Sequence, residues 1–269
     1  LDKYLQKKNV NYILVQGDTS TAYGGALYGF LNKIPVIHLE AGLRTYDLDS
    51  PWPEEFYRQN IARMSKIHLS QSFSSKNNLY KENIKENVYV VGNPGIDYFV
   101  EQLKLLQIRN KKEDEKKRIV VTMHRRENIE NNIQKFIDNL ILFSNKNKNY
   151  EFIWPVHSNI KIKKIITNNK YKLDKLNLIL LEPLRYKEFL QYLINADLII
   201  TDSGGIQEEA AYLGKPLLIA RDKTERVDII RLGLGKIIHA DARLLEEGIK
   251  YLKNKNLTNK KINEWRKIQ

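Results

Sequence analysis

The segment TDSGGIQEEA at 201–210 places residue types that bind phosphate directly after an apolar run. Ser203 offers a hydroxyl, and Gly204 and Gly205 let the backbone approach a ligand closely. Backbone N–H groups at the start of the following helix carry partial positive charge, which suits a phosphate group. The glutamate pair in the first turns can accept hydrogen bonds from sugar hydroxyls. The segment predicts a phosphate-binding turn, although a simple capped strand-to-helix turn explains the same residues equally well.

Arginine and histidine follow other apolar runs in the same half of the chain. RDKTER supplies Arg221 and Arg226, whose guanidinium groups match the geometry of phosphate oxygens. HRREN begins with His124, which can act as a general acid or as a hydrogen-bond donor to phosphate near neutral pH. His157 ends a further run. Lone arginines and histidines are more often solvated or structural, and it is their shared position after apolar runs that favours function.

Carboxylates occupy the equivalent positions in the first half of the chain. Asp18 in GDTST and Glu40 in HLEAGLR each follow an apolar run. Two carboxylates facing a cleft can act as base and acid if burial or repulsion separates their pKa values. Asp18 as a helix N-cap and Glu40 as the partner of Arg44 are the structural alternatives, and the residues alone slightly favour them. The segment HLEAGLRTYDLDSPWPEE at 38–55 contains five carboxylates in all.

The composition describes an ordinary globular chain with excess positive charge. Of 269 residues 42% are hydrophobic, none is cysteine, and the formal net charge is +13. A nucleic acid or an anionic membrane could explain the charge. The lysines are not interleaved with aromatic residues, however, so solvated lysine faces explain it better. We expect neither partner, no membrane span and a cytoplasmic location, because long apolar segments, a signal peptide and cysteines are all lacking.

Short apolar runs alternate with stretches of helical periodicity along the whole chain. This alternation predicts an α/β fold with parallel sheets covered on both faces. Predicted strands are 11–17, 35–40, 66–72, 88–94, 118–124, 150–157, 176–183, 196–202 and 215–221. Predicted helices are 21–33, 54–65, 101–118, 132–145, 186–195 and 205–214. The polar motifs lie at the carboxyl ends of the strands, where parallel sheets bind their ligands.

A charged segment divides the chain into two such alternating parts. We predict a Rossmann-like domain over 1–97, an exposed helix and linker over 98–118, and a second Rossmann-like domain over 119–269. If the two domains face each other, their strand ends line one cleft.

Taken in order, the motifs resemble those of the bacterial non-hydrolysing UDP-N-acetylglucosamine 2-epimerases. The set is GDTST, HLEAGLRT-x-DL-x-SPWPEE, HRREN, PVH, TDSGGIQEEA and RDKTER, and it covers nearly all of the chain. The resemblance implies two Rossmann-like domains in the glycosyltransferase-B arrangement, with the active site between them. The family's N-terminal G-T-R-P-E loop and its C-terminal helix have no counterpart here, so the first domain is expected to be truncated and this chain by itself to be inactive or very weak.

The family reaction inverts C2 of UDP-N-acetylglucosamine (UDP-GlcNAc) to give the N-acetylmannosamine isomer (UDP-ManNAc). UDP is eliminated to leave 2-acetamidoglucal and then adds back. The resemblance implies these catalytic positions: Asp18, Glu40, Glu54 and His124. It implies these substrate contacts: Ser203, Gly204 and Gly205 at the diphosphate, Glu209 at the ribose, Arg221 and Arg226 near the diphosphate, and Phe189 near the uracil. Which carboxylate takes the C2 proton stays open.

The resemblance also implies properties beyond the reaction centre. The non-hydrolysing branch has a regulatory UDP-GlcNAc site, and Arg125, His157 and Glu54 resemble part of its lining. It implies a homodimer and no metal or dinucleotide cofactor. Three alternatives remain: a hydrolysing UDP-GlcNAc 2-epimerase, a 2-epimerase of another UDP-N-acetyl sugar such as a 2,3-diacetamido uronate, and a non-catalytic nucleotide-sugar sensor.

Overall fold

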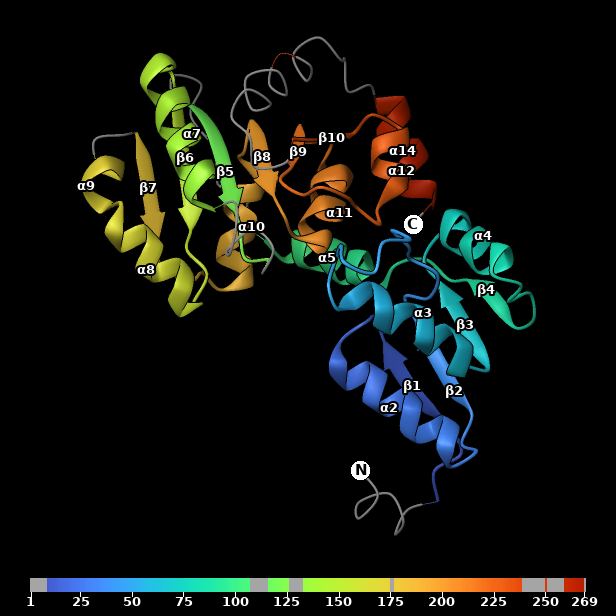
Figure 1. Ribbon diagram of the computed structural model, residues 1–269. Helices are drawn as coiled ribbons and strands as arrows, with labels where there is room; N and C mark the ends of the chain where they lie inside the picture. The colour runs from blue at the N-terminus through green and yellow to red at the C-terminus, as the bar shows by residue number, and fades with distance from the viewer. Residues whose placement is uncertain are drawn as a thin grey trace. The chain divides into compact units, whose positions relative to one another are not determined.

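The computed structural model describes residues 9–106, 116–125, 133–174, 177–238, 250 and 259–268. The chain forms two compact units. Unit 1 comprises Leu1–Pro94 with Lys267–Gln269, and unit 2 comprises Gly95–Arg266. Both are α/β units with parallel sheets (Figure 1).

The described part of unit 1 is built on a four-stranded parallel sheet in the order β1-β2-β3-β4. Its strands are β1 (Ile13–Gln16), β2 (Val36–Leu39), β3 (Ile67–Ser70) and β4 (Val88–Val90). Its helices are α2 (Ser20–Leu31), α3 (Glu54–Met64) and α4 (Phe73–Lys81). Helix α2 begins after Thr19, whose hydroxyl accepts the Ala22 N–H at 3.1 Å. Thr19 therefore caps this helix, rather than Asp18.

The described part of unit 2 holds a six-stranded parallel sheet in the order β10-β9-β8-β5-β6-β7. Its strands are β5 (Lys117–Thr122), β6 (Tyr150–Pro155), β7 (Leu178–Leu181), β8 (Leu198–Thr201), β9 (Leu217–Ile219) and β10 (Gly235–Ile237). Counted from β5 along the chain, this is the doubly wound order 3-2-1-4-5-6. The strand order reverses between β5 and β8, and such folds bind ligands beyond the carboxyl ends of the strands at that point.

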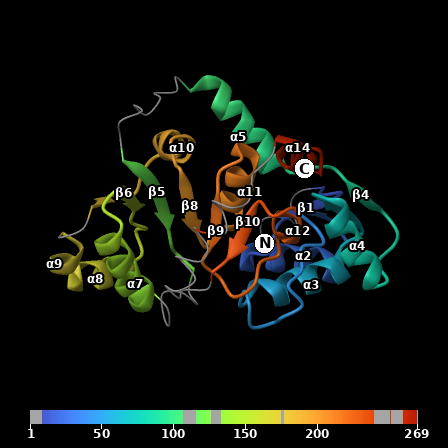
Figure 2. The ribbon, with the colours of Figure 1, turned by 90° about the horizontal axis from the view of Figure 1, so that it is seen from above.

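Helices cover both faces of the unit 2 sheet (Figure 2). One face packs on α7 (Ile133–Lys146) and α8 (Ile160–Asn168) through a cluster that includes Ile119 and Trp154. The other face packs on a second cluster that includes Val120. The helices of the second cluster are α5 (Pro94–Leu105), α10 (Tyr186–Ile194), α11 (Gly204–Leu213), α12 (Val227–Arg231) and α14 (Asn259–Ile268). The short α9 (Lys170–Leu173) follows α8. Adjacent residues of one strand thus enter opposite cores, which explains the continuous apolar runs in the sequence.

The α/β fold with parallel sheets is confirmed, and all nine predicted strands are present within a few residues of their expected ends. The prediction of an exposed helix over 98–118 is wrong in part. Helix α5 begins at Pro94, buries Ile96 and Phe99 in the core of unit 2, and ends at Leu105. The predicted linker lies largely outside the described residues. Within the described part of the chain, none of the helices has the length and apolar character needed to span a membrane.

Candidate active site

A buried carboxylate joins two strand ends at the point where the strand order of unit 2 reverses. Asp202 follows β8 and is fully buried. It accepts the backbone N–H groups of His124, at 2.9 Å, and of Arg125, also at 2.9 Å. The His124 ring nitrogen Nδ1 lies 3.1 Å from Asp202 Oδ1. This carboxylate therefore fixes both the turn after β5 and the orientation of the His124 ring, so that the other ring nitrogen is available to a ligand.

His124 belongs to a shallow pocket at the same sheet edge. Its ring stacks on that of His157, with centroids 5.5 Å apart and planes inclined by 20°. The pocket has a volume of about 260 Å³, and its apolar lining includes Phe189 and Ile206. Of the predicted site residues, His124, His157 and Phe189 thus line one pocket. A mainly apolar pocket with a few polar groups suits a flat heterocycle.

The glycine turn lies next to this pocket. Ser203 is the N-cap residue of α11, but its side chain makes no capping hydrogen bond. A methyl group built on Gly204 would lie 2.9 Å from the guanidinium carbon of Arg226, whereas one built on Gly205 would meet nothing within 4 Å. The start of α11 is therefore open at Gly205, and the guanidinium group of Arg226 lies against Gly204. These features make it a favourable place for an anionic group.

The two predicted arginines differ in their surroundings. Arg226 Nε donates to Glu208 Oε1 at 3.1 Å, and a second nitrogen pairs with Glu225. Arg221 is only 2% exposed and pairs with Glu225 at 3.0 Å. The structure therefore brings Arg226 to the glycine turn and buries Arg221 behind it. Glu208 and Glu225 hold the arginines in place.

Glu209 on α11 has an environment unlike that of its neighbour Glu208. Its Oε1 accepts the hydroxyl of Tyr186, on α10, at 2.7 Å. Its Oε2 is buried and has no hydrogen-bond partner among the described residues. Burial, together with the nearby charge of Glu208, raises the pKa of Glu209 from 4.5 to about 7, although the Tyr186 hydrogen bond opposes this shift. Burial also raises the pKa of Tyr186, which is accordingly a neutral donor.

In unit 1, two predicted carboxylates lie at neighbouring strand ends. Gly17 has a φ of +67°, and a methyl group built on it would lie 3.2 Å from Glu40 Oε2. The Glu40 carboxylate therefore packs against the residue that precedes Asp18. Glu40 itself has a φ of +66°, a strained conformation for a residue other than glycine. Asp18 forms an ion pair with the buried Arg58 of α3, which fixes its carboxylate.

A buried histidine supports this corner of unit 1. One ring nitrogen of His38, on β2, lies 2.9 Å from the carbonyl oxygen of Gly17. Burial lowers the pKa of His38 to about 3, so the ring is neutral at neutral pH. A neutral ring that donates to this carbonyl holds the turn between β1 and Asp18. On the adjacent strand β3, burial and the charge of Arg44 lower the pKa of His68 to about 4.

The acidic pair at the start of α3 is divided between two roles. Glu55 is fully buried and accepts the backbone N–H groups of Thr45, at 3.0 Å, and of Tyr46, at 3.1 Å. It therefore fixes the loop that follows β2. Glu54 is half-buried at the first residue of the helix. Arg44 pairs with Glu82, at 2.6 Å, so its suggested pairing with Glu40 is wrong.

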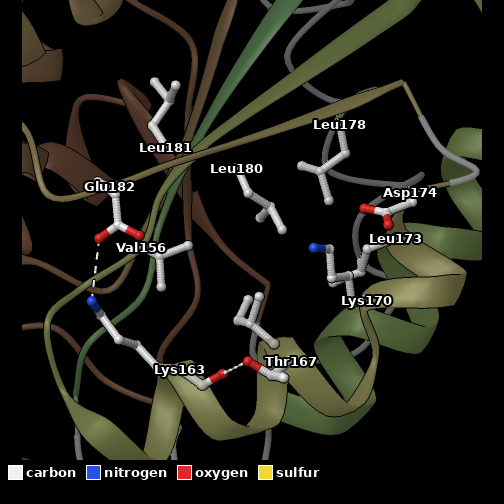
Figure 3. Close-up of a pocket in the computed structure, with 11 residues that line it drawn as sticks. Val156, Lys163, Thr167, Lys170, Leu173, Asp174, Leu178, Leu180, Leu181 and Glu182 are labelled. Carbon is white, nitrogen blue, oxygen red and sulfur yellow. Dashed lines mark hydrogen bonds and ion pairs between the residues drawn. The ribbon is translucent and has the colours of Figure 1, made fainter.

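Another cavity of unit 2 contains none of the predicted site residues. It has a volume of about 440 Å³ and lies at the edge strand β7, against α8 and α9 (Figure 3). Its lining combines aliphatic side chains with two lysines and two carboxylates, and Lys163 pairs with Glu182 at 3.2 Å. The charges of these two lysines and two carboxylates balance in sign.

Comparison with known proteins gives the family. The family model described as UDP-N-acetylglucosamine 2-epimerase matches residues 1–268. The chain belongs to the UDP-N-acetylglucosamine 2-epimerase family. A relative of that name from Campylobacter jejuni is 40% identical over 86% of this chain and 63% of its own length. One from Neisseria meningitidis is 38% identical over 89% of this chain and 67% of its own.

Solved structures of epimerases share the fold. The N. meningitidis UDP-GlcNAc 2-epimerase bound to UDP-GlcNAc matches with a TM-score of 0.87 and 35% identity, over 99% of this chain and 76% of that one. The Methanocaldococcus jannaschii enzyme in complex with UDP-GlcNAc and UDP matches with a TM-score of 0.84 and 33% identity, over 96% and 73%. This chain spans 63% and 66% of the C. jejuni and Salmonella borreze relatives, so the matched region is shorter than those epimerases.

Several residues that hold the candidate site together were not predicted from the sequence. Asp202, Arg58 and Tyr186 contact predicted site residues. Glu55 fixes the loop that follows β2. Asp202 had a usable signal, because it is the residue between a buried strand and the glycine turn. The others act across contacts that no local sequence pattern reports.

Proposed function

We propose that the protein interconverts UDP-GlcNAc and UDP-ManNAc by eliminating UDP to form 2-acetamidoglucal and adding it back, and that it supplies ManNAc for surface polysaccharide. The observation that carries this proposal is the grouping of His124, the Gly204 turn and Arg226 at the strand-order reversal of unit 2. Together they provide a proton donor, a helix N-terminus and a fixed cation for a departing diphosphate. Family membership and the UDP-GlcNAc bound to a relative support the same ligand.

Unit 2 is proposed to bind the UDP moiety. Backbone N–H groups at Gly204 and Gly205 and the guanidinium of Arg226 suit the diphosphate. Acceptor capacity on Glu209 suits the ribose hydroxyls, because one carboxylate oxygen has no donor among the described residues. The pocket beside Phe189 suits the uracil ring. The buried Arg221 would act indirectly, through Glu225.

Unit 1 is proposed to supply the acid–base groups at C2. In the elimination a carboxylate removes the C2 proton while the C1–O bond to UDP breaks. In the reverse step a proton is delivered to the opposite face of C2 and UDP re-forms the C1–O bond. Asp18, Glu40 and Glu54 are the candidates. The ion pair of Asp18 with Arg58 fixes one carboxylate in advance, which general acid–base catalysis requires. Glu40 has the kind of backbone strain that is found at functional sites.

The regulatory and assembly properties of the family are extended to this protein as proposals. Arg125 and His157, with Glu54, are proposed to contribute to a regulatory UDP-GlcNAc site. Arg125 is held through its backbone N–H by Asp202. The protein is proposed to act as a cytoplasmic homodimer, which size-exclusion chromatography with light scattering tests directly.

Product analysis by ¹H and ³¹P NMR tests the proposed reaction. The whole protein that contains this sequence is incubated with UDP-GlcNAc. Signals of UDP-ManNAc that grow while the diphosphate stays esterified support the proposal. Release of free ManNAc and UDP would instead show the hydrolysing reaction. UDP binding without turnover of UDP-GlcNAc would favour a different UDP-N-acetyl sugar, and a 2,3-diacetamido uronate is the substrate to test next.

A further inference from the structure

The hydroxyl of Tyr186 donates a hydrogen bond to Glu209, the carboxylate proposed to bind ribose. Tyr186 lies outside the sequence motifs that carry the family resemblance. It is the first residue of α10, whereas Glu209 lies in the second turn of α11. Its hydroxyl lies 2.7 Å from Glu209 Oε1. The Tyr186 ring stacks on that of Tyr98, on α5, with centroids 5.8 Å apart and planes inclined by 23°. Tyr98 on α5 therefore holds the Tyr186 ring, and Glu209 on α11 holds its hydroxyl.

The Tyr186 bond leaves the Glu209 carboxylate only partly satisfied. An ionised carboxylate accepts about four hydrogen bonds. Glu209 accepts one, and its second oxygen is buried with no donor among the described residues. A buried acceptor without a donor costs about 1–3 kcal/mol. The carboxylate therefore has capacity for further donors, and a ribose diol offers two on adjacent carbons.

We propose that Tyr186 is a positioning residue for nucleotide binding, because its hydroxyl orients the Glu209 carboxylate toward the two ribose hydroxyls. The inference rests on the proposed function in taking UDP as the ligand. Tyr186 itself acts through Glu209 and does not touch the nucleotide. Removing its hydroxyl leaves the carboxylate free to rotate and without its donor.

A pH dependence follows from the groups that face Glu209. These are Tyr186 on α10, whose hydrogen bond lowers the pKa of Glu209, and Glu208 on α11, whose charge raises it. Tyr98 on α5 contacts Tyr186 but not the carboxylate. The ionised carboxylate is the better acceptor for a diol, so UDP affinity rises as the pH increases through about 7. Without the Tyr186 donor this rise moves to higher pH.

Calorimetric titration of the whole protein that contains this sequence, with UDP and with 2′,3′-dideoxy-UDP, tests the inference. Tyr186→Phe is expected to weaken UDP binding at pH 7.5 by roughly 10-fold, the effect of about one hydrogen bond, and to change dideoxy-UDP binding less than about 2-fold. Tyr192→Phe is the matched control, since Tyr192 lies half-buried on the same helix. It should leave both affinities unchanged. Combining Tyr186→Phe with Glu209→Ala, which removes the acceptor, should cost no more affinity than Glu209→Ala alone.

Results that differ from these expectations would refute separate parts of the inference. Equal weakening of both nucleotides, or additive losses in the double variant, would show that Tyr186 only supports the fold. Should Tyr186→Phe not fold, the wild-type protein still decides: its preference for UDP over dideoxy-UDP must grow as the pH rises from 6 to 8, and a constant preference would refute the inference. Failure of the wild type to bind UDP at all would refute the proposed function itself.

Discussion

Replacing Glu209 by glutamine should stabilise unit 2 above neutral pH while weakening nucleotide binding. Burial raises the pKa of this carboxyl from 4.5 to about 7, which means that the folded protein disfavours its ionised form. Glutamine keeps the shape, and its carbonyl oxygen can still accept the Tyr186 hydroxyl. The variant therefore removes the cost of a buried charge and loses little else in the unliganded state.

The size of the effect follows from linkage. A pKa that is higher in the folded state than in the unfolded one contributes stability below the unfolded value of 4.5, and that stability is lost as the pH rises through about 7. At about 1.4 kcal/mol per pKa unit, the loss is about 3 kcal/mol by pH 8. Glu209→Gln is spared this loss. Its advantage over the wild type should grow from near zero at pH 4.5 to about 1–3 kcal/mol at pH 8.

Urea unfolding followed by tryptophan fluorescence measures this difference in unit 2, because Trp154 and Trp265 are buried there and are at most 1% exposed. The control is Glu208→Gln, whose carboxylate pairs with Arg226 at 3.1 Å and should lose stability at pH 8 instead. A Glu209→Gln variant that is no more stable than the wild type at pH 8, or whose advantage does not change with pH, would refute the reasoning.

Three further predictions concern other parts of the structure. The methyl group of Gly205→Ala meets open space, so the free energy of unfolding should stay unchanged or rise by up to about 1 kcal/mol. UDP binding measured by calorimetry should weaken by at least about 10-fold, because the diphosphate is proposed to approach the backbone there. Unchanged affinity would contradict that assignment. Gly204→Ala should weaken binding too, by displacing Arg226. The lowered pKa values of His38 and His68, about 3 and about 4, mean that their contribution to stability is present above pH 6.5 and lost as the pH falls. At pH 5 each histidine should lower the free energy of unfolding by about 2 kcal/mol. Backbone amides of β2 and β3 should then exchange hydrogen faster at pH 5 than at pH 7, after correction for intrinsic rates. Equal protection at the two pH values would contradict the burial argument.

Strands and their order along the chain were readable from sequence because buried parallel strands leave continuous apolar runs. Strand β10 was missed, since its three residues Gly235–Ile237 carry no such run and are held by pairing with β9. Helix α8 was missed for a different reason. Its lysines suggested a solvated segment, although Ile162 and Ile166 provide a buried face. The beginning of α5 was hidden in the same way by the charges that follow it.

The motifs supplied the predicted site residues, and the structure shows how several of them are held. The position of His124 was predictable, but its orientation depends on Asp202, which is 78 residues away in sequence. The pairing of Arg44 with Glu82 spans 38 residues, and local charge patterns favoured a nearer partner. Of the adjacent Glu54 and Glu55, only three-dimensional contacts show which one fixes the loop. Contacts of this kind depend on how the chain folds back on itself, which spacing along the sequence does not report.

The central claim is that the protein breaks the C2–H bond of a UDP-N-acetyl sugar. The most direct measurement is incubation of the whole protein that contains this sequence with UDP-GlcNAc in deuterated water, followed by NMR of the recovered nucleotide sugars. Cleavage of this bond places deuterium at C2 of UDP-ManNAc and, as equilibrium is approached, of UDP-GlcNAc. Formation of UDP-ManNAc that retains hydrogen at C2 would contradict the claim.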